Sequence, residues 1–144
     1  MYKTMYKKIL VALDATTADE TILKHVAALA LSFHSSVVLL HVADGWAARW
    51  FGSDAVSPEI KNDMAYLESI RARLAAEGLS VDLDLAYGDP ADQIIKWIET
   101  RGCDLLAMST HGHRFFSDLI YGSTAEKVRH RVTVPVLLLK MDKP

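Results

Sequence analysis

The sequence predicts an α/β fold: a single doubly wound, five-stranded parallel sheet with helices on both faces. Short runs of β-branched and aliphatic residues alternate with longer stretches in which apolar residues recur at helical spacing. This alternation is typical of a parallel sheet, and right-handed crossovers then place helices on both of its faces. Because 144 residues suit one domain, residues 1–144 are expected to form a single unit.

Two strands and two helices are predicted in the first half of the chain. The apolar runs Ile9–Leu13 and Val37–Val42 predict the strands. Between them, Thr17 opens the sequence Thr-Ala-Asp-Glu, a capping box that predicts the start of the first helix. Ser57-Pro58 predicts an N-cap followed by proline at the first position of the second helix, and Gly78 predicts its end.

Three strands and two helices are predicted in the second half. Val81–Ala86 alternates apolar residues with aspartates, which is typical of an edge strand with one wet face. Asp89-Pro90 predicts the start of a third helix, and Gly102 predicts its end. The remaining strands and the last helix are predicted over Leu105–Ser109, Val134–Leu139 and Thr124 to Arg131.

Charge and cysteine content argue against several classes of protein. With 16 basic and 18 acidic residues the net charge is −2, whereas a nucleic-acid binder needs a clustered positive face. The single cysteine, Cys103, excludes an internal disulfide framework and fits a reducing compartment. No apolar run approaches the ~18 residues of a membrane span, and the N-terminal apolar stretch ends at Asp14, too early for a signal peptide. We therefore expect a cytoplasmic protein that binds neither nucleic acid nor membrane.

The segment that follows the fourth predicted strand carries the chemistry. Gly112 and Gly122 permit positive φ and a close approach of the backbone to a ligand. Ser123-Thr124-Ala125-Glu126 is a second capping box, and free amides at the helix start favour a phosphate there. The spacing predicts two glycine turns around a phosphate chain, although two ordinary turns explain it equally well. In doubly wound sheets ligands bind beyond the carboxyl ends of the strands, which agrees with this position.

Other side chains leave alternatives open. His111 and His113 resemble a metal pair, but too few further ligands stand nearby in sequence, so no metal site is predicted. His41, at a strand end, is expected to be a buried, hydrogen-bonded histidine. The aromatic cluster of Trp46, Trp50 and Phe51 could cover a ligand, contact a second subunit or cover the domain's own helices. No Ser-His-Asp or Cys-His arrangement can be assigned, so no catalytic residue is predicted.

Four segments of the chain resemble the universal stress protein family, and the resemblance covers nearly the whole sequence. They are Lys8–Asp14, Leu39–Val42, Gly88-Asp89-Pro90 and the stretch from Ser109 to Leu137. The ATP-binding branch of that family has the pattern Gly-x2-Gly-x9-Gly-Ser/Thr. Gly112, Gly122 and Ser123 match it here, whereas Ser109 replaces the first glycine. Serine adds a hydroxyl that can contact a ligand, but it disfavours positive φ.

The resemblance implies a Rossmann-like fold of the adenine nucleotide alpha hydrolase type, with an ATP site at the strand ends. ADP and AMP are alternative ligands, and Mg²⁺ would accompany the nucleotide. Asp14 would then contact the nucleoside, or else satisfy amides of its own turn. Met108 would contact base or ribose, or else belong to the core. The complete implied set is Ala12, Leu13, Asp14, Val42, Met108, Ser109, Gly112, Gly122, Ser123 and Thr124.

The last predicted strand bears on assembly. Val134–Leu139 is apolar and near the chain end, so an unpaired edge there would invite aggregation. Pairing with a second copy removes the hazard, and the resemblance implies the same homodimer. The leading hypothesis is an ATP-binding regulatory domain of the stress response with an unknown protein partner. The alternatives are an interaction module that binds no nucleotide and a slow ATP hydrolase.

Overall fold

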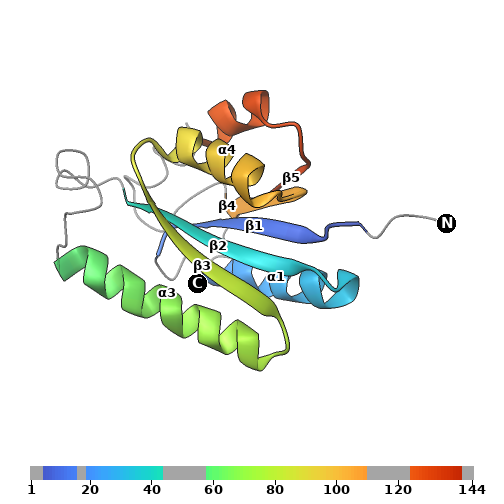
Figure 1. The fold of residues 1–144 in the computed structure, drawn as a ribbon, viewed down its shortest axis with the longest axis vertical. Coiled ribbons are helices and arrows are strands. Elements are labelled where there is room, and N and C mark those ends of the chain that lie inside the picture. The colour runs from blue at the N-terminus through green and yellow to red at the C-terminus, as the bar shows by residue number, and fades with distance from the viewer. Residues whose placement is uncertain (1–4, 16–18, 44–57, 110–123, 141–144) are drawn as a thin grey trace.

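The computed structural model describes residues 5–15, 19–43, 58–109 and 124–140, and it confirms the predicted fold (Figure 1). One parallel sheet has the strand order β3-β2-β1-β4-β5. The strands are β1 (Lys8–Leu13), β2 (Ser36–Ala43), β3 (Ser80–Tyr87), β4 (Leu105–Ser109) and β5 (Val136–Leu139). The helices are α1 (Asp19–Phe33), α3 (Pro58–Ala76) and α4 (Pro90–Arg101), and residues 124–131 are also helical.

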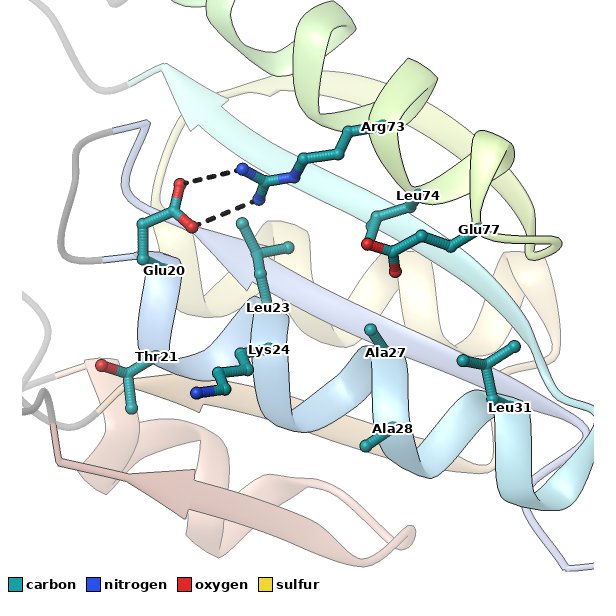
Figure 2. A pocket seen from close by; sticks show the side chains of 10 residues that line it. All are labelled: Glu20, Thr21, Leu23, Lys24, Ala27, Ala28, Leu31, Arg73, Leu74 and Glu77. Carbon is teal, nitrogen blue, oxygen red and sulfur yellow. Dashed lines mark hydrogen bonds and ion pairs between the residues drawn. The ribbon is translucent and has the colours of Figure 1, made fainter.

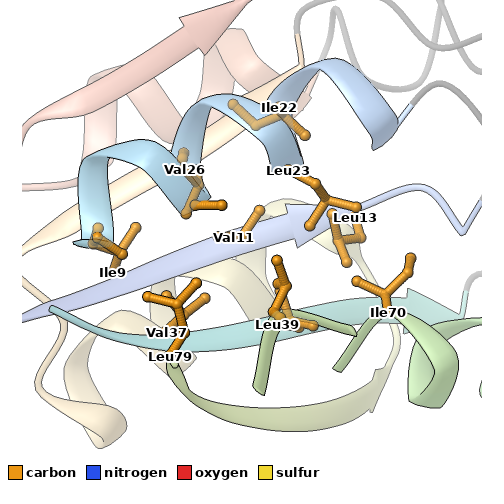
Figure 3. Packing of buried hydrophobic residues seen from close by; sticks show 14 of the residues in the cluster. Ile9, Val11, Leu13, Ile22, Leu23, Val26, Val37, Leu39, Ile70 and Leu79 are labelled. Atoms are coloured by element: carbon orange, nitrogen blue, oxygen red, sulfur yellow. The ribbon is translucent and has the colours of Figure 1, made fainter. Parts of the chain in front are cut away.

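The helices cover both faces of the sheet. Helices α1 and α3 lie on one face, and α4 lies with the helical residues 124–131 on the other (Figure 1). Successive residues of β1 therefore enter different cores. Ile9, Val11 and Leu13 pack beneath α1 and α3 (Figure 3). Leu10 and Ala12 pack toward α4. Because both faces are covered, the central strands are almost continuously apolar.

The strand order creates a switch point at β1. From β1 the chain proceeds outward through β2 to β3, then crosses back over the sheet to form β4 on the other side of β1. The connections that leave β1 and β4 thus diverge to opposite faces. In open α/β sheets this divergence makes a crevice at the carboxyl ends of the strands.

The predicted edge strand is confirmed, but its polar face is not simply wet. Strand β3 is an edge strand of the sheet, and Asp82 and Asp84 face α4. Asp84 accepts a hydrogen bond from Trp97 Nε1 at 2.8 Å, and Asp82 accepts one from Arg101 Nη2 at 2.7 Å. The expectation of an open polar face was therefore wrong at Asp84, because side chains of α4 reach across and satisfy its carboxylate.

The helix ends follow the predicted signals where the structure describes them. Asp89 accepts a hydrogen bond from the Asp92 amide, Pro90 stands in the first turn of α4, and Gly102 ends that helix with a φ of 66°. Thr17 lies outside the described residues. None of the helices within those ranges is long and apolar enough to cross a membrane.

The last strand is shorter than predicted. It begins at Val136 instead of Val134, because Pro135 has no amide to donate and joins the sheet only through its carbonyl, which accepts the Leu106 amide at 3.0 Å. Strand β5 nevertheless lies at the edge of the sheet, as predicted.

Candidate functional site

Strand register brings the predicted residues to one edge of the sheet. Leu13 pairs with His41 at the ends of β1 and β2, and Ala12 pairs with Met108 across β1 and β4. Ser109, the last residue of β4, follows Met108 directly. The carboxyl ends of the three central strands therefore meet at one place, at the switch point of the sheet.

The predicted residues divide between the two faces of the sheet. Ala12, Val42 and Met108 face α4 and belong to the core on that side, where Met108 is fully buried. Leu13 belongs to the core beneath α1 and α3, and strand alternation places Ser109 on the same face. A ligand at the edge would therefore meet the backbone of Leu13 and Met108, because their side chains are already packed.

Ser109 has an unusual environment for a buried hydroxyl. Its Oγ is inaccessible to solvent and has no hydrogen-bond partner among the residues that the structure describes. Burying a hydroxyl without a partner costs free energy, so such an atom needs an explanation. Ser109 also has strand geometry and no positive φ, so serine here carries no backbone strain. The departure from the glycine pattern is thus compatible with the fold.

Asp19 holds the turn between β1 and α1. Its carboxylate, only 1% exposed, accepts the amides of Asp14 and Ala15, both at 2.8 Å. Ala15 takes a φ of 62°, an uncommon conformation for a residue with a Cβ. The sequence left open whether Asp14 accepts amides of its own turn. For the amides of Asp14 and Ala15, the acceptor is Asp19 instead. The sequence signal for this capping was an acidic residue in the first turn of the helix.

His41 is buried and hydrogen-bonded, as predicted. Its Nδ1 lies 3.0 Å from the carbonyl oxygen of Leu13, and its Nε2 lies 3.3 Å from Oδ2 of Asp63 on α3. A carbonyl can only accept, so Nδ1 carries the proton of that bond. Asp63 was not foreseen, because nothing in the local sequence of α3 connects it with β2.

Tyr66 lies one helical turn after Asp63 and is the second residue that the sequence did not single out. Burial, followed by the negative charges of Asp19 and Glu20, raises the pKa of Tyr66 to about 12. The phenol therefore lies close to the start of α1. Helix α3 thus approaches both side chains that contact the β1–α1 turn.

The remaining predicted residues are only partly described. Thr124, 4% exposed, is the first described residue of the last helix. The phosphate residues Gly112, Gly122 and Ser123 lie outside the described residues, as do His111, His113 and the aromatic cluster. Within the described ranges, no three His, Cys, Asp or Glu side chains gather in a way that could hold a metal.

A separate groove lies between α1 and α3, with a volume of about 560 Å³ (Figure 2). Ala27 and Leu74 belong to its lining, and the exposed ion pair of Arg73 with Glu20, at 3.2 Å, lies at one end of it. None of the predicted nucleotide-binding residues lines it. The groove is therefore distinct from the edge of the sheet that the sequence indicated.

The family model and the related sequences that match this chain all belong to one protein family. The family model of the universal stress protein family matches residues 5–140. Universal stress protein MJ0577 of Methanocaldococcus jannaschii is 30% identical, over 94% of this chain and 96% of its own length. Universal stress protein MJ0531 of the same organism is 27% identical, over 98% of this chain and 86% of its own.

Solved structures share the fold. A structure of MJ0577 superposes with a TM-score of 0.81 at 30% identity, over 97% of this chain and 99% of that one. The universal stress protein from Archaeoglobus fulgidus in complex with dAMP superposes with a TM-score of 0.71 at 20% identity, over 94% of this chain and 99% of that one.

Proposed function

Since this chain belongs to the universal stress protein family, we propose that the carboxyl edge of its sheet binds ATP or a related adenine nucleotide and that the domain acts as a regulator. Nucleotide binding would change the surface that the domain offers to a protein partner. The proposal includes a cytoplasmic location and no dedicated catalytic activity. ADP, AMP and an accompanying Mg²⁺ belong to the same proposal.

The observation that carries the proposal is the buried hydroxyl of Ser109. Within the described part of the chain its Oγ has no partner, and it stands at the switch point, where ligands bind in sheets of this kind. A ribose hydroxyl or phosphate oxygen within reach would satisfy it. The unpaired state costs roughly 1–3 kcal/mol, which a bound ligand would recover.

Neighbouring residues supply the other parts of the proposed site. Asp14 would contact the nucleoside, and the backbone at Val42 would contact the adenine. Thr124, with Gly112, Gly122 and Ser123, would hold phosphates at the start of the last helix, where free amides and the helix dipole favour anions. A relative of the same fold, the Archaeoglobus fulgidus protein, is known in complex with dAMP.

Isothermal titration of nucleotide-free protein with Mg-ATP tests the proposal, together with native mass spectrometry of the freshly purified protein. We expect binding heat, or ATP, ADP or AMP carried through purification. Gly122→Val should abolish binding while the protein stays folded. No heat and no thermal shift at millimolar ATP would overturn the proposal and favour an interaction module without nucleotide. Phosphate release from bound ATP would instead favour a slow hydrolase.

We propose further that two copies pair through the last strand, over the predicted range Val134–Leu139. The outer edge of β5 has no partner strand among the described residues. All four side chains of the strand are partly exposed in the single chain, although they are apolar. A parallel-sheet protein normally covers such an edge, and a second copy is a self-complementary cover.

A further inference from the structure

Two side chains hold opposite ends of one peptide unit at the end of β1. The carbonyl oxygen of Leu13 and the amide of Asp14 belong to the same planar group. His41 Nδ1 lies 3.0 Å from that oxygen, and Asp19 Oδ1 accepts that amide at 2.8 Å. Since the two groups point in opposite directions in a trans peptide, the pair prevents rotation of the peptide plane.

The orientation of this plane decides where Asp14 points. Fixing the plane fixes ψ of Leu13 and φ of Asp14, and φ of Asp14 sets the direction of its Cα–Cβ bond. The second oxygen of Asp19 holds the next amide, at Ala15, so the turn is fixed on both sides of Asp14. The side chain proposed to contact the nucleoside thus begins from a backbone that is held at three points.

Helix α3 contacts His41 and brings a second side chain near Asp19. Asp63 Oδ2 lies 3.3 Å from the other ring nitrogen of His41, Nε2. Tyr66, one turn further along, lies near Asp19, whose charge contributes to its raised pKa. Residues three apart share a helix face, so Asp63 and Tyr66 lie on one face of α3. A small shift of α3 would therefore reach the turn through His41.

We infer that His41 is a positioning residue for the nucleotide site, fixing the Leu13–Asp14 peptide together with Asp19 and being oriented in turn by Asp63. This inference rests on the proposed function and deepens it. His41 acts without touching the ligand. Its Nδ1–H donates to the Leu13 carbonyl oxygen and so orients the peptide.

Two substitutions separate the two nitrogens of the ring. In His41→Asn the side-chain amide nitrogen takes the place of Nδ1 and can still donate to Leu13, whereas the contact with Asp63 is lost. In His41→Gln the amide nitrogen takes the place of Nε2, so the contact with Asp63 is kept and the bond to Leu13 is lost. Titration with Mg-ATP should show Kd for His41→Asn within about threefold of wild type. For His41→Gln we expect a Kd about tenfold higher, equivalent to one lost hydrogen bond.

Thermal unfolding of both variants shows whether each is folded, and two measurements need no nucleotide. NMR of the ring nitrogens in the wild type should find Nδ1 protonated; an unprotonated Nδ1 would overturn the inference even if neither variant folds. Exchange of the Asp14 amide should be faster in His41→Gln than in His41→Asn.

The outcomes distinguish the inference from the proposed function. If the wild type binds Mg-ATP and His41→Gln binds it equally well, the inference fails and the proposed function stands. If the wild type takes up no Mg-ATP, the proposed function fails, and ring protonation and amide exchange alone decide whether His41 orients the peptide.

Discussion

Asp19 and Asp14 lie five residues apart, and the carboxylate of the first accepts the backbone amide of the second at 2.8 Å. The bond spans the whole turn between the central strand and the first helix. Asp19 is almost completely buried, so its charge needs hydrogen-bond donors, and the amides of Asp14 and Ala15 supply two of them. One carboxylate thus accepts two successive backbone amides of the turn.

Replacing Asp19 by alanine should lower the free energy of unfolding by about 3 kcal/mol. Hydrogen bonds to a charged group contribute roughly 1.5–3 kcal/mol each, and two partly buried amides would lose their acceptor. Urea denaturation measures the change. The control is Glu20→Ala, which removes an exposed ion pair with Arg73 and should change stability by less than about 1 kcal/mol. Equal effects of the two substitutions would contradict this account of the turn.

Ser109→Ala should have opposite effects on the free and the nucleotide-bound protein. Without nucleotide it removes a buried hydroxyl that has no partner among the described side chains and backbone groups, so the protein should become more stable by about 1 kcal/mol. With Mg-ATP the stabilisation by ligand should shrink, because the hydroxyl is no longer there to contact it. Thermal unfolding with and without Mg-ATP measures both effects.

Ser35→Ala is the matched control for the substitution of Ser109. Ser35 is also buried, but its hydroxyl donates to the carbonyl of Tyr6. Its removal should destabilise the protein and leave nucleotide binding unchanged. If Ser109→Ala behaves like Ser35→Ala in the nucleotide-free protein, the Ser109 hydroxyl has a partner in solution and loses its significance for the site.

The strands and several helix ends could be predicted because their signals are local. Asp89 and Gly102 act within a few residues of their positions in the chain, and the apolar run of β1 shows its burial directly. His41 could be predicted as buried from its place in a strand. Its partners could not, because they depend on the register that sets Leu13 beside His41 and on the docking of α3.

The polar face of β3 was wrongly predicted for the same reason. Alternating aspartates correctly indicated an edge strand, but the partner of Asp84 is Trp97 on the helix that follows. Whether the Trp97 indole meets Asp84 depends on how α4 packs across the sheet, and the periodicity of the sequence does not predict that packing. Non-local side-chain contacts of this kind position the candidate site. The sequence therefore predicted that the site lies at the carboxyl edge of the sheet, but not which residues orient the backbone there.

Cys103 should make the protein less stable in alkali. Burial raises the pKa of its thiol from 9.0 to about 11. Between these values the unfolded chain releases the proton while the folded chain keeps it, so the free energy of unfolding falls as pH rises from 9 to 11. Below pH 9 both states keep the proton and this contribution is complete. Denaturation by urea at pH 8, 9, 10 and 11 should show a steeper decline for the wild type than for Cys103→Ala; parallel declines would contradict it.

Leu138→Pro should dissociate the proposed dimer without unfolding the chain. The Pro135 carbonyl points toward β4, so by strand alternation the amides of residues 136 and 138 point to the open edge. Proline at 138 removes one such amide, which a pairing strand needs, and proline is tolerated at sheet edges. Leu138→Ala is the control, because it loses similar packing but keeps the amide. Sedimentation equilibrium should find a dimer for wild type and Leu138→Ala and a monomer for Leu138→Pro. A dimer that persists in Leu138→Pro would show that the two copies meet on another surface.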